Sequence, residues 1–499
     1  MQKRSVWVVK KRSEIPSGRR LVRCKCVFKI KRNGVFRVKL VACGYSQIPG
    51  VDFTENYSPV INDITFRLLI LAMMFNRLDA KIVDVETAFL YGTLEEEIYM
   101  ECPPGMGEVI DDCREIEDSI LLLRQCIYGL VQAARQYYKR FVTILKKIGF
   151  KGGDVDPCLF SKKSEKGLCF IAIYVDDNLM IGHNAAIEDA IHLLKKENLV
   201  LKIEDSLHDY LSCEVKFSKD MSKGWLGQPH MISSIQREFG EEVKGLRRYL
   251  TPGTPGARQV RADDPKMVIP TEKHARYRTG VGMLLYLVKH SRPDIANCVR
   301  ELSKVLDGPT ELSYREMLRC VKYVLDSKDL GLRLEPNGTP IGDPWDIVCY
   351  SDSDWAGDPA NRRSVSGYII YVHGVPIVWQ SAMQKVVSLS STEAEWYSLS
   401  EAVKDIVFLI SLCKSLQLQV RLPVTVRVDN TGTIFMSNNV QTSSRTRHIR
   451  SSYVREYVED GVIRIIFVPT GKNDSDILTK NVNGELLAKH SKRLVVGRT

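Results

Sequence analysis

Two adjacent aspartates interrupt an otherwise apolar stretch of the chain between Phe170 and Ile181. The tetrapeptide Tyr174-Val175-Asp176-Asp177 separates one short apolar segment from another, a pattern that predicts two buried strands joined by a hairpin turn. Paired carboxylates at the tip of such a hairpin could hold a divalent metal ion. An Asp-Asp-Asn turn is, however, equally typical of an ordinary hairpin.

A second apolar strand also ends in a carboxylate. Residues 81–83 lead into Asp84, and the chain then runs on through Val85-Glu86-Thr87-Ala88-Phe89-Leu90. If this strand neighbours the hairpin, Asp84 and Asp176 meet at one point. Carboxylates grouped in this way are the ligands of two-metal sites that transfer phosphoryl groups.

The N-terminal 40 residues are strongly basic, with 14 Lys and Arg against the single acid Glu14. Residues 26–30 and 36–40 alternate apolar and basic side chains around Asn33-Gly34, which predicts a hairpin. A three-residue loop from Asn33 to Val35 gives the following cross-strand pairs: Ile30 with Val38, Phe28 with Leu40, Lys31 with Arg37, and Lys29 with Lys39. Four cations on one face suit a nucleic-acid phosphate backbone. A merely solvated charged face and a transit peptide are the alternatives.

Strands and helices alternate along the chain, which predicts a mixed α/β (α+β) fold. At 499 residues the chain is long enough for two to four domains. Helical patterns dominate between residues 220 and 343, where a Pro/Gly stretch at 251–257 indicates a loop or linker. From about residue 345 the expected order is strand, hairpin, helix, strand, helix, strand, helix. The second of these helices is expected at residues 445–458.

The composition excludes several classes of protein. The longest apolar runs reach 8 residues, whereas a bilayer-spanning helix needs about 20. The 13 cysteines contain no C-x2-C pair, so they indicate neither a zinc site nor a disulfide framework. A reducing compartment is therefore expected.

Several motifs in order resemble the reverse transcriptase of copia-type LTR retrotransposon Pol polyproteins. They are KIVDVETAFLYG at 81–92, EIYMECPP at 97–104, IYGLVQAARQYY at 127–138, YVDD at 174–177, SRPDIA at 291–296, YSDSDWAGD at 350–358, RRSVSGY at 362–368, SLSSTEAEWYSL at 388–399 and DILTK at 476–480. The resemblance implies polymerase fingers and palm at residues 1–219 and a mostly helical, thumb-like connection at 220–343. It implies an RNase H-like mixed-sheet domain at 344–480 and a C-terminal tail at 481–499.

The resemblance implies specific roles for residues in the polymerase part. Asp84, Asp176 and Asp177 correspond to the catalytic triad, with Asp84 and Asp176 as metal ligands. Phe89 corresponds to an aromatic residue beside the sugar of the incoming nucleotide, although packing in the palm core is an alternative. Arg37 and Lys39 lie where the fingers meet the triphosphate. Lys29 and Lys31 complete the expected nucleic-acid-binding face.

Four carboxylates correspond to the RNase H site and its metal ligands: Asp352, Glu395, Asp429 and Asp476. Each also has a structural explanation. Thr392-x-x-Glu395 is a capping-box pattern, Asp476 could belong to a helix N-cap cluster with Asp474 and Ser475, and Asp429-Asn430 could be a turn. Four carboxylates in this order favour a two-metal phosphodiesterase site.

The sequence also departs from the family pattern at seven positions, none of which is a catalytic carboxylate: Cys26, Cys43, Glu86, Val131, Ala134, Ser212 and Arg450. Loss of cations at some of them weakens phosphate contacts. No zinc knuckle, protease motif or integrase HHCC motif is found, so the chain is expected to be the polymerase and RNase H part alone, as a processed product, a truncated gene model or a degraded copy.

The resemblance therefore implies an RNA-directed DNA polymerase with RNase H activity. Its cofactor would be Mg²⁺, two ions per active site, with Mn²⁺ as an alternative. Its partners would be an RNA template, a DNA primer, an RNA–DNA hybrid and dNTPs, without a membrane, in an intracellular location that is cytoplasmic and particle-associated or nuclear. A catalytically inactive relic that binds nucleic acid and an RNase H with a vestigial polymerase remain the alternatives.

Overall fold

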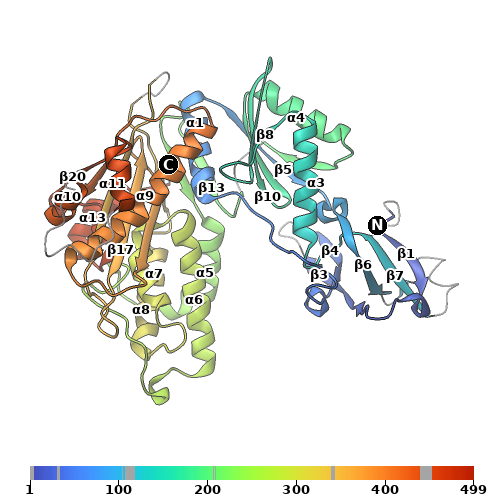
Figure 1. Ribbon diagram of the computed structural model, residues 1–499. Coiled ribbons are helices and arrows are strands. Elements are labelled where there is room, and N and C mark those ends of the chain that lie inside the picture. The colour runs from blue at the N-terminus through green and yellow to red at the C-terminus, as the bar shows by residue number, and fades with distance from the viewer. Residues whose placement is uncertain are drawn as a thin grey trace. The chain divides into compact units, whose positions relative to one another are not determined.

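The computed structural model describes residues 5–498 except 31–33, 104, 107–117, 206, 208–209, 339–342 and 439–451. The fold is mixed α/β, as predicted from the sequence. Two compact units make up the chain (Figure 1). The first consists of Met1–Asn62 and Asp79–Ser206, and the second of Asp63–Leu78 and Leu207–Thr499. The division into fingers and palm, connection, RNase H-like domain and tail stays a prediction.

A six-stranded sheet forms the centre of the first unit. Its strands lie in the order β12 (Leu201–Glu204), β5 (Asp79–Val85), β11 (Asp177–Gly182), β10 (Gly167–Tyr174), β9 (Leu159–Ser164) and β8 (Lys151–Gly152). The α4 helix (Asn184–Lys196) packs against β5, β10 and β11. The middle of β10 is buried without interruption, which explains why its sequence is continuously apolar rather than alternating.

The rest of the first unit contains a smaller sheet, a separate hairpin and one long helix. The sheet has the order β1 (Trp7–Lys11), β7 (Ser119–Gln125), β6 (Thr93–Glu101) and β2 (Leu21–Val22). The α3 helix (Ala133–Lys147) buries Tyr137, Phe141, Ile144 and Leu145, the spacing of one apolar helix face. It packs against β6 and the short helix η4 (Ala88–Tyr91).

The basic hairpin forms as predicted, but the predicted register is wrong. β3 (Cys24–Ile30) and β4 (Phe36–Ala42) pair Ile30 with Phe36, Phe28 with Val38, and Lys29 with Arg37. The predicted pairs were Ile30 with Val38, Phe28 with Leu40 and Lys29 with Lys39. The partner of each described residue is shifted by two positions from the predicted one. A shift of two residues preserves the faces of the strands, so Lys29, Arg37 and Lys39 still share one face. Lys31 lies outside the described residues.

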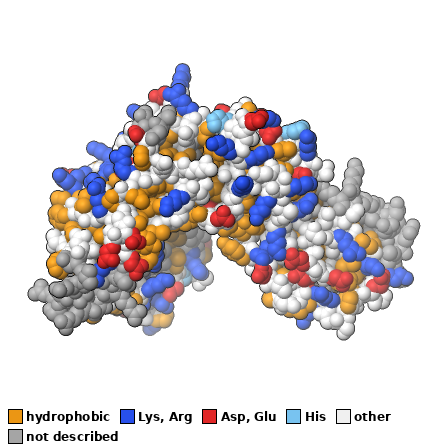
Figure 2. Space-filling model, turned by 45° about the horizontal axis from the view of Figure 1, so that its top comes forward, with side chains coloured by type: hydrophobic (Ala, Val, Ile, Leu, Met, Phe, Trp, Pro, Cys, Tyr) orange, Lys and Arg blue, Asp and Glu red, His pale blue; other side chains and the backbone are white. Residues whose placement is uncertain are grey.

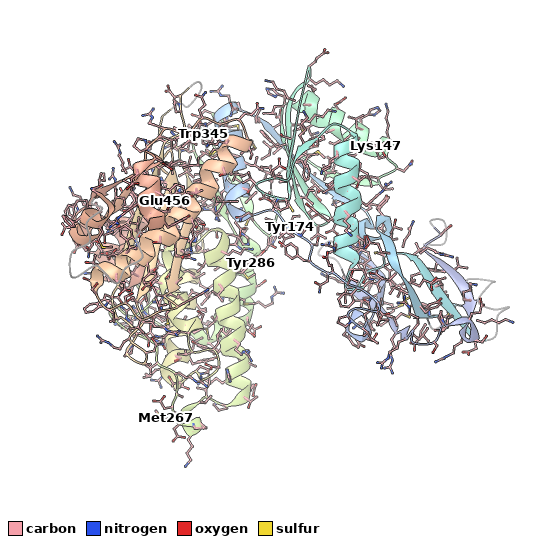
Figure 3. The ribbon with its side chains drawn as sticks, in the orientation of Figure 1. Lys147, Tyr174, Met267, Tyr286, Trp345 and Glu456 are labelled. Carbon is pink, nitrogen blue, oxygen red and sulfur yellow. The ribbon has the colours of Figure 1, made fainter. Side chains whose placement is uncertain are left out.

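The helices of the second unit include one from a distant part of the sequence. α1 (Asp63–Asn76) buries eleven of its 14 residues and packs against the strand β18 (Val375–Met383). Arg67 of α1 donates to the Ile377 carbonyl at 2.7 Å, and Phe75 packs edge-on against Trp345, which is labelled in Figure 3. The other helices of this unit are α5 (Pro229–Val243), α6 (Thr271–His290), α7 (Ala296–Ser303), α8 (Glu311–Asp326), α9 (Ser391–Ser415), α10 (Thr431–Asn438), α11 (Ser452–Glu459), α12 (Asp476–Thr479) and α13 (Gly484–Ser491).

A mixed five-stranded sheet carries the second candidate site. Its order is β18 (Val375–Met383), β17 (Val365–Val372), β16 (Ile347–Asp354), β19 (Val424–Val428) and β20 (Ile463–Phe467). The β16–β17 and β17–β18 pairs are antiparallel. β16 is parallel to β19, and β19 is parallel to β20. The long helix α9 packs against β16 and β17, so this segment forms the mixed sheet that the sequence predicted. The helix expected at residues 445–458 is α11, and residues 445–451 lie outside the described part.

A second sheet of this unit joins distant segments in the order β13 (Glu214–Phe217), β14 (Gly224–Gly227), β15 (Leu330–Leu334) and β21 (Val495–Gly497). Among the described residues, the cysteines are all free thiols. Every helix in the same residues is too short or too polar to cross a bilayer. Figure 2 shows Lys and Arg side chains spread over the visible face of both units, so positive charge is not confined to the N-terminal hairpin.

Candidate active sites

The first candidate site lies where β5, β11 and β12 run side by side. The register places Asp84 of β5 opposite Asp177 of β11 and opposite Lys202 of β12. The Val85 N–H donates to the Asp176 carbonyl at 3.0 Å, which ties the end of β5 to the hairpin tip. The two strands are therefore neighbours, and Asp84 and Asp176 come together as the sequence predicted.

The hairpin tip has an unusual backbone. Tyr174, labelled in Figure 3, pairs with Asp177 across a two-residue turn formed by Val175 and Asp176. Val175 has a φ of +55°, and a β-branched residue rarely adopts this conformation because its side chain crowds the backbone. Such strain at a turn that carries two carboxylates is typical of a functional site.

The charges at this site influence each other. Burial raises the pKa of Asp84, and the neighbouring Asp176 charge raises it further, while Lys202 and Arg37 lower it. Asp84 and Asp176 are half-buried, and Asp177 is exposed. Cations bound beside Asp84 and Asp176 would relieve this repulsion, so the donor set fits a divalent metal.

The basic hairpin lies close enough to the same carboxylates for their charges to act on it. Burial and the Arg37 charge lower the pKa of Lys39, and the charges of Asp176 and Asp84 oppose this shift. The Lys39 Nζ lies 4.0 Å from the centre of the Tyr128 ring, and the Tyr128 ring lies 4.7 Å from that of half-buried Phe89. Phe89 also contacts Tyr137 edge-on at 6.5 Å.

The Tyr128 ring thus contacts both Lys39 and Phe89, close to Asp84 and Asp176. Sequence reasoning missed Tyr128, although the motif IYGLVQAARQYY contains it. Its position depends on the Ala42 N–H, which donates to the Tyr128 carbonyl at 2.8 Å. The turn is tight: a Cβ on Gly129 would lie 2.1 Å from the Ala42 oxygen. Contacts of Phe89 suit both a position beside the nucleotide sugar and simple packing.

The second candidate site gathers three aspartates from separate elements of the second unit. Asp352 lies in β16, Asp429 directly follows β19, and Asp476 begins α12. One carboxylate oxygen from each lies within 4.8 Å of the others. Because β16 and β19 are parallel neighbours, their carboxyl ends reach the same edge of the sheet. In the part of the chain that the structure describes, this is the one group of three or more possible metal ligands.

Glu395 of α9 adds a fourth carboxylate. Its Oε1 accepts hydrogen bonds from the Ser353 N–H and hydroxyl, each at 3.0 Å. Its Oε2 is buried and has no hydrogen-bond partner among the described residues. A buried acceptor without a donor is costly, and a bound cation would satisfy it, so the four side chains fit a divalent metal.

The structural explanations for these carboxylates do not hold in two cases. Ser390, not Thr392, caps α9 and accepts from the Glu393 N–H, so the capping-box explanation for Glu395 is wrong. Ser475 is the N-cap residue of α12 but makes no capping hydrogen bond through its side chain. Asn430 does cap α10, since its Oδ1 accepts from the Thr433 N–H. Asp429 instead accepts from the Thr470 hydroxyl at 2.8 Å.

Burial and mutual repulsion shift the pKa values of the cluster. Burial raises the pKa of Asp352 well above its usual range, and the charges of Asp476 and Asp429 raise it further. The same causes, burial first and then Asp352 and Asp429, raise the pKa of Glu395. Burial also raises the pKa of Asp476. The cluster therefore resists full ionisation unless a cation is present.

Two neighbours of the cluster were missed as functional residues although both lie in the motif DILTK. Thr479 donates its hydroxyl hydrogen to Asp352 Oδ2. The Lys480 Nζ lies 3.0 Å from Asp476 Oδ1. Burial lowers the pKa of Lys480, but the Asp352 and Asp476 charges outweigh it and raise the pKa. The ammonium group supplies positive charge at the carboxylates.

The family departures lie outside the two carboxylate groups. Cys26 and Glu86 are exposed, and Cys43 is buried. The Val131 N–H donates to Gln47 Oε1 at 2.9 Å, and Ala134 lies in the first turn of α3. Arg450 is outside the described residues. Ser212 has a φ of +57°, so the serine occupies a left-handed conformation that suits the glycine usual in the family.

Residues 5–244 match the family model for reverse transcriptase (RNA-dependent DNA polymerase). The chain is 31% identical over 496 residues to the retrovirus-related Pol polyprotein from transposon RE2 of Arabidopsis thaliana, and 32% identical over 479 residues to that from transposon TNT 1-94 of Nicotiana tabacum. These alignments cover 96% and 94% of the chain, but 32% and 35% of the relatives.

The chain thus spans about a third of the length of the curated relatives that it matches. A solved structure of the foamy viral protease-reverse transcriptase in complex with dsDNA aligns with 94% of this chain and 80% of that chain, with a TM-score of 0.41 and 11% identity.

Proposed function

Because the chain belongs to the reverse transcriptase family of copia-type retrotransposon Pol polyproteins, we propose that it copies RNA into DNA and cleaves the RNA strand of the resulting hybrid. Its substrates are then an RNA template, a DNA primer, dNTPs and an RNA–DNA hybrid. Such a polymerase works inside the cell, in cytoplasmic particles or the nucleus. The observation that carries the proposal is the presence of a separate carboxylate group in each unit.

In the polymerase site, Asp84 and Asp176 hold the metal ions beside the hairpin tip, and Asp177 completes the triad. Arg37 and Lys39 contact the triphosphate, since cations dominate phosphate binding. Phe89 packs under the sugar, and the Tyr128 ring contacts both Lys39 and Phe89. Lys29, on the same face as Arg37, contacts the template or primer backbone.

In the nuclease site, Asp352, Glu395, Asp429 and Asp476 hold the metal ions. Mg²⁺, or Mn²⁺ in its place, would supply Lewis-acid activation of the attacking oxygen and charge stabilisation of the leaving oxygen when held by these residues. Thr479 orients Asp352 through its hydroxyl. Lys480 compensates part of the negative charge at Asp476, which lowers the repulsion that the scissile phosphate meets on entry.

One specific observation favours a second candidate, an RNase H with a vestigial polymerase. Among the described residues, only the nuclease carboxylates form a group of three possible metal ligands, whereas Asp84, Asp176 and Asp177 do not. Both candidates predict cleavage of RNA, whereas an inactive relic would bind nucleic acid without cleaving it.

Extension of a labelled DNA primer on a labelled RNA template, with Mg²⁺ and dNTPs, tests the proposal when both strands are resolved on a gel. Extended primer together with shortened RNA supports the full activity. Shortened RNA without extension, on a preformed hybrid, supports the RNase H candidate. Intact strands in both assays, with the nucleic acid bound, refute the proposed enzyme and leave the inactive relic.

A further inference from the structure

The second unit contains an open cleft lined by three arginines. Arg247 and Arg248 follow α5, Arg319 projects from α8, and Tyr249 and Thr251 complete the wall opposite the start of α13 at Gly484. The cleft encloses about 340 Å³, and no carboxylate lines it. We refer to Arg247, Arg248, Tyr249 and Arg319 as the arginine cleft.

Arg319 is fixed by neighbours that leave its charge available. Its Nη2 donates to the Thr251 hydroxyl at 2.8 Å, and its guanidinium lies 4.3 Å from the centre of the Tyr249 ring. Its Nε is buried without a hydrogen-bond partner among the described residues. The Arg247 guanidinium lies 5.6 Å from the same ring. Tyr249 therefore holds two cations close together by cation–π contacts.

The nearest acid on the helix does not neutralise these cations. Glu316, one turn before Arg319, instead accepts hydrogen bonds from the Thr254 N–H at 3.0 Å and from the Thr254 hydroxyl. In the described ranges, none of the three arginines forms an ion pair. Arg315 of the same helix does pair, with Glu311 at 3.8 Å. Three unpaired arginines facing one cleft favour an anionic ligand.

We propose that the arginine cleft binds backbone phosphates of an RNA–DNA hybrid. This inference rests on the proposed function, because it assigns the cleft to the substrate of the nuclease site. Guanidinium groups bind phosphate through paired N–H donors. The exposed guanidinium groups of Arg247 and Arg248 supply such donors, and the Arg319 guanidinium adds positive charge to the same cleft.

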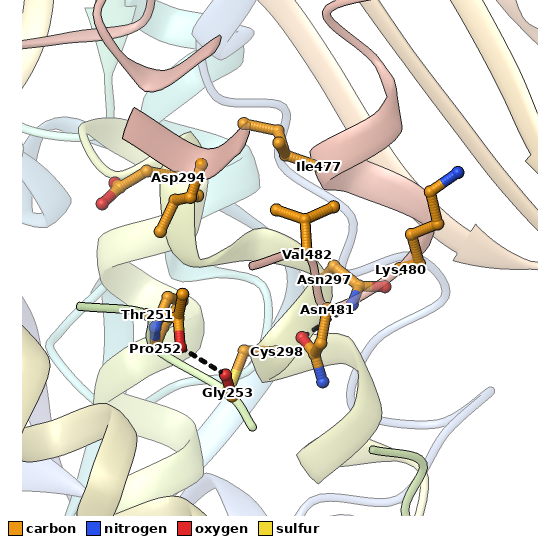
Figure 4. A pocket seen from close by; sticks show the side chains of 11 residues that line it. Thr251, Pro252, Gly253, Asp294, Asn297, Cys298, Ile477, Lys480, Asn481 and Val482 are labelled. Atoms are coloured by element: carbon orange, nitrogen blue, oxygen red, sulfur yellow. Dashed lines mark hydrogen bonds between the residues drawn. The ribbon is translucent and has the colours of Figure 1, made fainter. Parts of the chain in front are cut away.

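The cleft lies close enough to the nuclease carboxylates to contact the same duplex. The chain runs from Asp476 through Lys480 to Gly484 at the cleft, and eight residues span at most about 29 Å. A duplex advances about 3.4 Å per base pair, so the two sites are within roughly eight base pairs. Asn481 fixes the connecting segment: its Oδ1 accepts from Asn297 at 2.9 Å (Figure 4).

The adjoining loop is fixed at the same place. The Thr251 hydroxyl donates to the Gly253 carbonyl at 2.8 Å, also drawn in Figure 4, and a Cβ on Gly253 would lie 2.8 Å from the Asn481 side chain. The Thr251 hydroxyl oxygen thus accepts a hydrogen bond from Arg319, while its hydrogen is donated to the Gly253 carbonyl. The Pro/Gly stretch that the sequence marked only as a loop or linker therefore positions Arg319.

The test measures binding of a 20-base-pair RNA–DNA hybrid to the full chain in EDTA, by fluorescence anisotropy over a range of salt concentrations. The paired substitution Arg247→Gln and Arg248→Gln changes exposed side chains and leaves the fold intact. It should weaken binding about five- to tenfold per arginine at 0.1 M salt and reduce the slope of log affinity against log salt by about two. Arg319→Gln should have a similar single effect, and Arg319→Lys should retain most of the slope.

The matched control is Arg315→Gln, on the same helix but ion-paired, and its slope should equal that of the wild type. A wild-type slope in the double variant refutes the arginine cleft as a hybrid site, leaving its cations simply solvated. Saturable binding of inorganic phosphate at millimolar concentration or below, lost in Arg319→Gln, would instead identify a free-anion site and overturn the assignment to the hybrid.

The same preparations separate this inference from the proposed function. RNA cleavage with Mg²⁺ should show a raised KM and an unchanged kcat in the double variant. Hybrid binding with the expected slopes but without any cleavage refutes the proposed activity and retains the cleft. A wild-type protein that does not bind the hybrid refutes both.

Discussion

Replacing Asp429 by Asn should stabilise the metal-free protein while abolishing RNA cleavage. Asp429 offers an oxygen within 4.8 Å of those of Asp352 and Asp476. Two full charges at this separation repel by about 3.5 kcal/mol at an effective dielectric constant of about 20. Asp429 is half-buried and the pKa values of Asp352 and Asp476 are raised, so we expect a gain of about 1 to 2 kcal/mol in the free energy of unfolding after screening by solvent.

The sign of the pH dependence follows from the raised pKa values. Asp352, Glu395 and Asp476 have pKa values above those of ordinary carboxyl groups, so the folded state holds protons that the unfolded state has lost. Their contribution to stability is fully present below about pH 4 and is lost as the pH rises through the raised values. The advantage of Asp429→Asn should therefore be small near pH 4 and larger at pH 8.

Urea unfolding in EDTA and in Mg²⁺, at both pH values, measures these effects. Mg²⁺ should stabilise the wild type more than Asp429→Asn, because a ligand that binds the folded state more tightly stabilises it more. Asp405→Asn is the matched control. Asp405 is another carboxylate with a pKa raised by burial, and it accepts from Tyr368 outside the cluster. Its substitution should leave the Mg²⁺ effect intact. An Asp429→Asn protein that is less stable than the wild type in EDTA at pH 8 would refute the repulsion.

Four further outcomes are expected. Asp176→Asn should abolish primer extension and leave RNA cleavage intact, and Asp352→Asn should do the reverse; loss of both activities in either folded variant would contradict independent sites. Lys29→Gln should lower the slope of log affinity against log salt by about one for template–primers of any sequence, and an unchanged slope would indicate a solvated face. Phe89→Val should raise incorporation of rCTP relative to dCTP opposite a template guanine; a parallel fall of both rates would indicate core packing. Ser212→Gly should stabilise the protein by about 1 kcal/mol in urea unfolding, because glycine adopts a positive φ without strain; no gain would mean that Ser212 is not strained.

The sequence predicted that Asp84 and Asp176 lie close together because each follows an apolar strand. Apolar strands are buried in the interior of a sheet, where they are neighbours. It also predicted which side chains share the basic face of the hairpin. It did not predict the register, because an Asn-Gly pair indicates a turn without fixing how many residues lie outside the ladder. The wrong register did not affect the faces predicted for Lys29 and Arg37, since a shift of two residues keeps every side chain on its face.

Contacts between distant segments were beyond the sequence pattern. Lys480 lies four residues after Asp476 and could have been predicted from that spacing on a helix. Tyr128 and Lys39 are far apart in the sequence, and only the tertiary structure brings them into contact. The arginine cleft combines a loop after α5 with α8. No periodicity relates Arg247 to Arg319, which are 72 positions apart in the sequence.

The membership of α1 in the second unit has a consequence for how the protein can be divided. The chain leaves the first unit after Asn62, returns at Asp79 and leaves again after Ser206, so no single cut separates the units. A fragment ending near residue 206 would carry α1 without the residues that bury it, including Ile377, whose carbonyl accepts from Arg67. Eleven otherwise buried side chains would then meet water. During synthesis α1 emerges from the ribosome long before β18. Its apolar side chains stay exposed and prone to aggregation until more than 300 further residues have been synthesised.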